Sequence, residues 1–332
     1  SPHGLTGAEF LVDHVHLSFE GNYLLAGLIG QQIGRVLSLI DPAVKRPWPT
    51  MAECARAVAL TGWDRYQLVQ TMRGRLSKRP FDHQLFHAAT LQALATQLKD
   101  WEPFTRPDSF PAWKAIYEGA LAAAPGDWLL HAQYAKLLEN FKVPQDAVRE
   151  WRQVVRLVPE YAIGHYQLAR LLDRGPDRAE ARQQALEALR WWPDFPQALN
   201  SLGIALAHDE QFSEACRRFE RALELDPYLF NAQINWAMTL EAAGRSAAAL
   251  THYSNAVSLQ PENPDLHFRL GVALAKQGNR SDAIAQLRET LRLDPNHPGA
   301  REQLTRLEGL LSTAPAPVGP AATNAGSLPP ER

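Results

Sequence analysis

Three residues near the start of the chain have side chains that acid–base chemistry or metal binding could use: Asp13, His14 and His16. An imidazole can accept the proton of a hydroxyl nucleophile, and a neighbouring carboxylate can fix the ring tautomer. The same side chains could instead ligate a metal ion, although no further cluster of ligands lies nearby in the sequence. In a third interpretation Asp13 caps a turn or a helix start, and the histidines only form hydrogen bonds. The residue types alone leave all three interpretations open.

The elements that would position these side chains are a short strand and a helix. The apolar triplet at 10–12, Phe-Leu-Val, suits the end of a buried strand, and Ser18 could cap the helix that follows. From Phe19 to about Ile40, apolar residues recur at a spacing that fits a helix packed along one side. The sequence therefore predicts a strand, a short loop with the Asp-His-Val-His block, and a helix.

This block, with Gly21 and the Leu-Leu-Ala run at 24–26, resembles the closing Asp-x-x-His segment of the SGNH (GDSL-type) hydrolases. The resemblance implies that His16 is a general base and that Asp13 is its orienting carboxylate. It also implies that residues 1–40 are the C-terminal remnant of an ester hydrolase or acyl-transfer domain.

That family takes its nucleophile from a Gly-Asp-Ser motif near the N-terminus of the domain, and only twelve residues precede Asp13. The nearest similar triplet, Pro-Asp-Ser at 107–109, lies after the block and lacks the glycine. We therefore assign no nucleophile and no oxyanion donor. We expect the chain to be a fragment whose catalytic part, together with any targeting segment, lies upstream.

The composition argues against several classes of partner. The 332 residues include 34 basic and 36 acidic side chains, for a net charge of −2, so there is no electrostatic reason to expect nucleic acid or an anionic membrane. No stretch is apolar enough over sufficient length to span a membrane. The two cysteines, Cys54 and Cys216, fit no metal-ligand spacing, and we expect them to be small packing residues. We expect no cofactor and no metal.

Six prolines from Pro125 to Pro295 recur at a constant spacing of 34 residues, a period typical of helix-turn-helix solenoids. At fixed distances before each proline, the residues are small (twelve before), mostly large (eight before) and aliphatic (four before). These offsets mark one face of a helix, which the proline then ends. The aliphatic positions are Leu121, Val155, Leu189, Leu223, Val257 and Leu291.

In period and residue types these units resemble the tetratricopeptide repeat. Gly203 and Gly271 would let a neighbouring helix approach closely, and Gly244 and Gly278 would supply the turn within a unit. The resemblance implies an all-α, right-handed helix-turn-helix solenoid over residues 94–311. Its predicted parts are a degenerate copy at 94–127, full repeats at 128–161, 162–195, 196–229, 230–263 and 264–297, and a cap helix at 298–311.

A solenoid of this kind presents a groove lined by the first helices of its units. We expect this groove to hold a protein or peptide segment; a purely structural spacer is the alternative. The lysine, asparagine and arginine set by which some such domains clamp a C-terminal carboxylate is absent from the groove positions. The positions implied by the repeat are Lys136, Glu139, Tyr166, Arg170, Asp173, Asn200, His208, Met238, Glu241, Phe268 and Lys276.

Residues 41–93 are predicted to be a helical connector that joins two domains. Proline-rich residues 41–49 form a linker, and Thr50 and Glu53 have the spacing of a capping box at the start of a helix. We expect Gly62 to end that helix, and two more helices to follow at about 63–76 and 82–99. Residues 312–332 contain many prolines and few residues that could pack, and we expect them to be disordered.

Overall fold

The computed structural model describes residues 49–77, 87–173 and 175–312. The predicted strand–loop–helix segment, with Asp13, His14 and His16, lies outside these residues, as does the proline-rich tail from 313 onward. The described residues contain fifteen α-helices and two short 3-10 helices, and no strand is found among them. The chain divides into two compact units at Leu171–Leu172, and each is described by itself.

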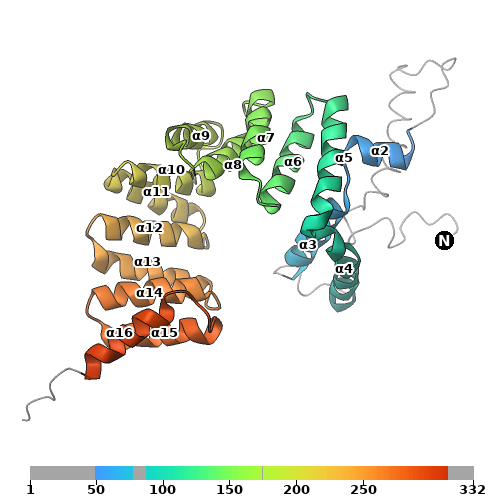
Figure 1. The fold of residues 1–332 in the computed structure, drawn as a ribbon. Helices are drawn as coiled ribbons and strands as arrows, with labels where there is room; N and C mark the ends of the chain where they lie inside the picture. Colours follow the sequence, from blue (N-terminus) through green and yellow to red (C-terminus); the bar gives the residue numbers. More distant parts are fainter. Residues whose placement is uncertain (1–48, 78–86, 174, 313–332) are drawn as a thin grey trace, which may run out of the picture. The chain divides into compact units, whose positions relative to one another are not determined.

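Unit 1 contains the connector helices and the first repeats (Figure 1). Its helices are α2 (Met51–Ala57), α3 (Gly62–Leu76), α4 (His87–Trp101), η2 (Glu102–Thr105), η3 (Pro107–Ser109), α5 (Phe110–Ala123), α6 (Trp128–Asn140), α7 (Pro144–Leu157) and α8 (Ala162–Leu172), whose last residue belongs to unit 2.

Unit 2 is a stack of helix pairs closed by a final helix (Figure 1). Its helices are α9 (Arg178–Trp191), α10 (Pro196–His208), α11 (Phe212–Leu225), α12 (Phe230–Ala242), α13 (Ser246–Leu259), α14 (Pro264–Lys276), α15 (Arg280–Leu293) and α16 (Ala300–Ser312). Each of the pairs α10–α11, α12–α13 and α14–α15 packs closely, and each second helix also contacts the first helix of the next pair or, at the end, α16.

The second helices bury a face that is close to the predicted one. The residues twelve and eight before each proline are buried in all the full repeats, as expected. The third buried position, however, lies five residues before the proline, whereas the aliphatic residues four before are only half-buried. A helix advances about 100° per residue, so a shift of one position turns a side chain away from the packed stripe. The buried residues at this third position are Ala120, Val154, Ala188, Ala222, Ala256 and Thr290.

The turn inside a repeat requires a left-handed residue at one fixed position. Gly244 and Gly278 have φ angles of +73° and +80°, which confirms their predicted role. The equivalent residues of two other repeats, Lys142 and Glu210, have φ angles of +61° and +59° although neither is glycine. This conformation costs a residue with a Cβ atom about 1–2 kcal/mol.

Buried histidines connect consecutive repeats. The Nε2 atoms of His165 and His267 donate to the carbonyl oxygens of Pro159 and Pro261, at 2.7 and 2.8 Å. The Nδ1 of His267 also lies 2.7 Å from the side chain of Gln286, nineteen positions later on α15. Each ring therefore donates to the carbonyl group at the end of one repeat while it is buried in the next repeat.

The connector differs from the prediction at Gly62. The first helix ends at Ala57, and Gly62 begins the next helix instead of ending the first. The reason is a second capping box, in which Thr61 and Asp64 exchange hydrogen bonds at the start of α3. Gly62 is needed for close packing, because a Cβ atom there would lie 2.8 Å from the ring of Phe104. The predicted capping box of Thr50 and Glu53 is confirmed.

Helix α5 has the pattern of a second helix, but α4 does not pair with it in the way that α6 pairs with α7. Instead, α4 packs against α3, with Leu94 and Leu98 in one cluster with Val69, Met72 and Leu76. The domain boundaries at residues 40, 93 and 311 remain predictions.

Candidate protein-binding surfaces

In unit 1, two of the four predicted groove residues already bind each other. Arg170 of α8 donates to the carboxylate of Glu139 on α6, and this carboxylate also accepts a hydrogen bond of 2.8 Å from the indole of Trp151. Lys136 is exposed, and Tyr166 is half-buried, which raises the pKa of its phenol. This part of the predicted groove therefore has less free charge than its sequence implies.

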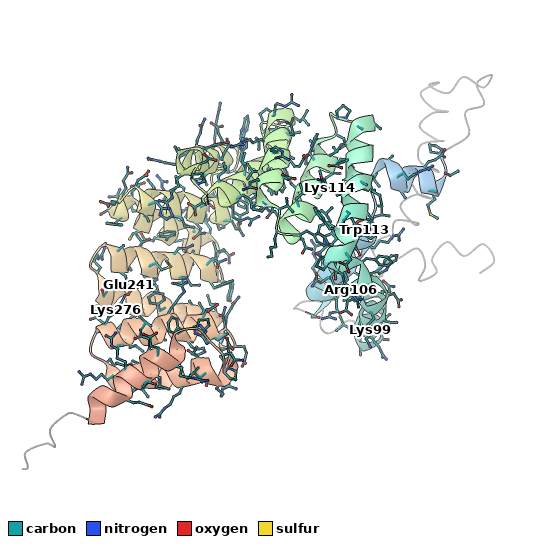
Figure 2. All side chains as sticks on the ribbon, in the orientation of Figure 1. Lys99, Arg106, Trp113, Lys114, Glu241 and Lys276 are labelled. Atoms are coloured by element: carbon teal, nitrogen blue, oxygen red, sulfur yellow. The ribbon has the colours of Figure 1, made fainter. Side chains whose placement is uncertain are left out.

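In unit 2, the equivalent contact links α12 to α14. The Nζ of Lys276 lies 3.0 Å from Glu241, which also accepts a hydrogen bond of 2.7 Å from the Tyr253 hydroxyl (Figure 2). Burial and the adjacent Glu241 carboxylate both raise the pKa of Tyr253. Two repeats thus share the same arrangement. A buried aromatic side chain of the second helix donates a hydrogen bond to a glutamate of the first helix, and this glutamate also pairs with a cation from the first helix of the following repeat.

The amide of Asn235, on α12, donates to Asn200, on α10, across 2.9 Å. Asn235 was not among the predicted groove residues, although it lies at the same place in its repeat as Ser201 and Arg269, 34 residues before and after it. The spacing of 34 residues from Asn200 or Phe268 leads to the neighbouring residue, Ile234, so the predicted repeat positions did not include Asn235. At the C-terminal end of α10, His208 lies 3.6 Å from Asp173.

Met238 is the most accessible apolar residue of the predicted set, with 45% of its surface exposed. It stands between two half-buried aliphatic residues at the same repeat position, Ile204 on α10 and Val272 on α14. The prediction missed both neighbours. Together these three residues form what we call the apolar row.

Phe268, on α14, was predicted to line the groove, but its ring also packs against other parts of unit 2. Its ring lies 4.7 Å from that of His297 and contacts the buried cluster between α15 and α16. A Cβ atom at Gly299 would lie 3.4 Å from the same ring. The structure therefore places Phe268 where the final helix closes the stack.

The first helices α10, α12 and α14 thus present three rows, which we call the first-helix face of unit 2. The apolar row lies in the middle of each helix. Towards the helix N-termini lie Asn200, Asn235 and Arg269, and towards the C-termini lie His208, Glu241 and Lys276. Such a mixture of a few apolar positions and directed polar groups suits recognition of a polypeptide.

A second surface lies in unit 1 between α2 and α5. A pocket of about 400 Å³ is lined by Arg56 and Ala57 of α2 and by small or apolar residues of α5, including Ile116 and Gly119. Nothing within 4 Å would meet a Cβ atom at Gly119, so the α5 face is open there. The pocket holds no arrangement of groups suited to catalysis.

Among residues 49–77, 87–173 and 175–312, no group of three His, Cys, Asp or Glu side chains is placed to hold a metal ion. Within the same ranges, none of the helices has the length and apolar character required to cross a bilayer. Cys54 and Cys216 are free and half-buried.

Comparison with known families and structures agrees with this architecture. The family model described as tetratricopeptide repeat matches residues 166–229 and 234–298. Over these residues the chain contains tetratricopeptide repeats. Its fold is therefore the all-α repeat solenoid that the 34-residue period predicted. The comparisons give no support for the predicted SGNH-type segment.

Several solved structures share the fold. PilW, a type IV pilus biogenesis factor, matches with a TM-score of 0.54 and 22% identity over 61% of this chain and 94% of its own. PilF of Pseudomonas aeruginosa matches with a TM-score of 0.50 and 18% identity, over 61% of this chain and 93% of its own. A chain of the Cut9–Hcn1 hetero-tetramer of the APC/C matches with a TM-score of 0.54 and 14% identity, over 86% of this chain and 52% of its own. At these identities the likeness concerns the fold alone.

Proposed function

We propose that this chain is a scaffold that binds a protein segment on the first-helix face of unit 2. The observation that carries the proposal is the set of three rows on α10, α12 and α14, in which Met238 is 45% exposed between two rows of polar groups. Methionine and arginine are enriched at protein interfaces, and Met238 and Arg269 lie next to each other on this face. The Cut9–Hcn1 hetero-tetramer offers an example of this fold in an assembly with another protein.

Selection from a random-sequence peptide display library tests the proposal directly. We expect the purified chain to enrich peptides whose binding is weakened by Met238→Lys and by Asn235→Ala. Met51→Lys is the matched control, because Met51 has a similar exposure of 42% but lies on α2, far along the sequence. Circular dichroism and thermal unfolding would show that each variant is folded.

Two results would overturn the proposal. Selected peptides that bind the Met238→Lys variant as tightly as the unchanged protein would mean that the binding surface is elsewhere. If no peptide is enriched, the alternative of a structural spacer is favoured.

A second proposal rests only on the sequence at 10–30. By its resemblance to SGNH hydrolases, this segment would supply His16 as general base and Asp13 as its partner to an ester hydrolase or acyl-transfer domain. In the native full-length polypeptide, His16→Ala should abolish hydrolysis of a simple ester such as p-nitrophenyl acetate, whereas His14→Ala should retain it. Retained turnover in the His16→Ala protein would end the assignment.

A further inference from the structure

The apolar row of unit 2 has a regular step along the stack of first helices. Ile204, Met238 and Val272 are each 34 residues apart, on α10, α12 and α14. Side-chain contacts join these helices in succession: Asn235 to Asn200 at 2.9 Å, then Lys276 to Glu241 at 3.0 Å. The backbones of α10 and α12 also lie close together, and packed helices have axes about 8–10 Å apart, so we take about this distance as the step of the row.

A ligand that lies along the row must present apolar side chains at the same step. A polyproline II segment rises about 3.1 Å per residue with three residues per turn, so the same face recurs every 9.3 Å or so. In a β-strand the same face recurs every 6.6–6.8 Å or so. A helix repeats about every 5.4 Å and matches the step only with every second turn. The polyproline II period therefore fits the row best.

The polar groups beside the row favour an extended ligand such as a polyproline II segment over a helix. The Asn235–Asn200 hydrogen bond uses one donor and one acceptor, so in the described part of the chain the Asn200 amide NH₂ and the Asn235 side-chain oxygen retain further capacity. A polyproline II backbone has no internal hydrogen bonds and can offer its own groups to these amides. A helical ligand satisfies its backbone internally and would leave the amides unused.

Charge adds one requirement. Lys276 is paired with Glu241, whereas Arg269 is exposed and forms no ion pair with any carboxylate of the described residues. Its guanidinium lies 3.5 Å from the sulfur of Met238, beside the apolar row, and also interacts with the Tyr253 hydroxyl, whose pKa it acts to lower. A carboxylate on the ligand would complement this cation, and Arg269 could bind it through two parallel hydrogen bonds.

We propose that the ligand is a polyproline II segment of a partner protein, with an apolar side chain at every third residue and a carboxylate next to Arg269. This inference rests on the proposed function and specifies its ligand class. In this proposal the side-chain amides of Asn200 and Asn235 bind the ligand backbone, the apolar row selects the spacing of the ligand's apolar side chains, and Arg269 binds the ligand carboxylate.

Three synthetic peptides of equal length test the ligand class. The first carries leucine at every third position in a proline-rich frame and ends in one glutamate. The second has the same composition with leucine at every second position, and the third places leucine at helical spacing in an alanine-rich frame. Fluorescence anisotropy should give the first peptide a Kd at least about tenfold lower than the others, equivalent to about 1.4 kcal/mol.

Variants connect this preference to the proposed residues. Met238→Lys should abolish binding of the first peptide, and Met51→Lys should leave it unchanged. Arg269→Gln should weaken binding of the first peptide and make that binding less dependent on salt concentration. In the Arg269→Gln variant, replacing the peptide glutamate with glutamine should have little further effect.

The outcomes separate this inference from the function on which it rests. Tighter binding of the second or third peptide, or no binding of the first, overturns the polyproline II ligand class. If peptides from the display library remain sensitive to Met238→Lys in that case, the proposed binding face stands. If they are insensitive to it, both proposals fail.

Discussion

The hydroxyl of Tyr117, on α5, donates a hydrogen bond of 2.6 Å to the carboxylate of Asp64, on α3, 53 positions earlier in the chain. Tyr117 lies eight residues before Pro125, the position at which Trp151 and Tyr253 donate to a glutamate on the first helix of their own repeats. For α5 the connector supplies this acceptor instead. Asp64 therefore anchors the repeats of unit 1 to the helices that precede them.

Removing the Tyr117 hydroxyl should destabilise this junction. Tyr117→Phe leaves the half-buried Asp64 carboxylate without one of its donors, which should lower the free energy of unfolding by about 1–3 kcal/mol. Urea denaturation followed by circular dichroism would measure the change. The control is Tyr134→Phe, since the Tyr134 hydroxyl has a longer bond of 3.3 Å to the exposed Glu118 and should contribute less. Equal losses in the two variants would contradict the anchoring role of Asp64.

The same carboxylate should make stability depend on pH. Burial raises the pKa of Asp64 above its usual value, although its hydrogen bonds from Thr61 and Tyr117 act in the opposite direction. Above about pH 4 the folded protein thus retains a proton that the unfolded chain has released, so stability falls as pH rises through this window. Asp64→Asn cannot titrate and should remove this part of the pH dependence.

Urea denaturation at a series of pH values would test this sign. The stability of the unchanged protein relative to Asp64→Asn should decline from about pH 4 upward and level off once Asp64 ionises in the folded state. An increase over the same range would mean that its hydrogen bonds outweigh burial.

Two helix glycines should respond to alanine in opposite ways. A Cβ atom at Gly203 would lie 2.6 Å from the ring of the fully buried Phe219, so Gly203→Ala should cost about 1–3 kcal/mol. At Gly119 no atom lies within 4 Å, so Gly119→Ala should gain about 0.5–1 kcal/mol from helix propensity. Thermal unfolding of both variants would measure the effects. If Gly203→Ala were stabilising, the ring of Phe219 would have to be able to move away from the new methyl group. If Gly203→Ala is destabilising, adding Phe219→Leu should restore most of the lost stability.

The left-handed turn position offers a further comparison. Gly278→Ala places a Cβ atom at φ +80° and should cost about 1–2 kcal/mol. Glu210→Gly occupies the equivalent position of another repeat at φ +59° and should be neutral or stabilising, because relief of strain offsets the greater freedom of the unfolded chain. Denaturation midpoints would decide this, and a loss of more than about 1 kcal/mol in Glu210→Gly would mean that the Glu210 side chain has a stabilising role of its own.

Features that depend on short stretches of the chain were predicted well. The 34-residue period placed the helix pairs, and the capping box at Thr50 lies where the sequence indicated. Gly203 and Gly244 have their predicted roles of close approach and turn. Each of these depends on residues within one helix turn or on the regular spacing of a repeat, which a sequence displays directly.

The sequence could not show which groove residues are already occupied. Glu139 and Arg170 are 31 positions apart and bind each other, so they are less available to a partner than their types suggest. The sequence placed Met238 in the groove, and its exposure of 45% agrees with this, but Ile204 and Val272 were missed because they resemble core residues in sequence.

The sequence by itself determined the repeat, its helix pairs and the glycine turns within the repeats. Only the tertiary structure decided that Asp64 holds Tyr117, that Gly62 starts a helix against Phe104, and that Arg269 lies beside Met238. The physical reason is the distance along the chain over which each interaction acts. Helix period and caps act over a few neighbouring residues, whereas a buried donor, a close contact or an ion pair depends on partners that only packing brings together.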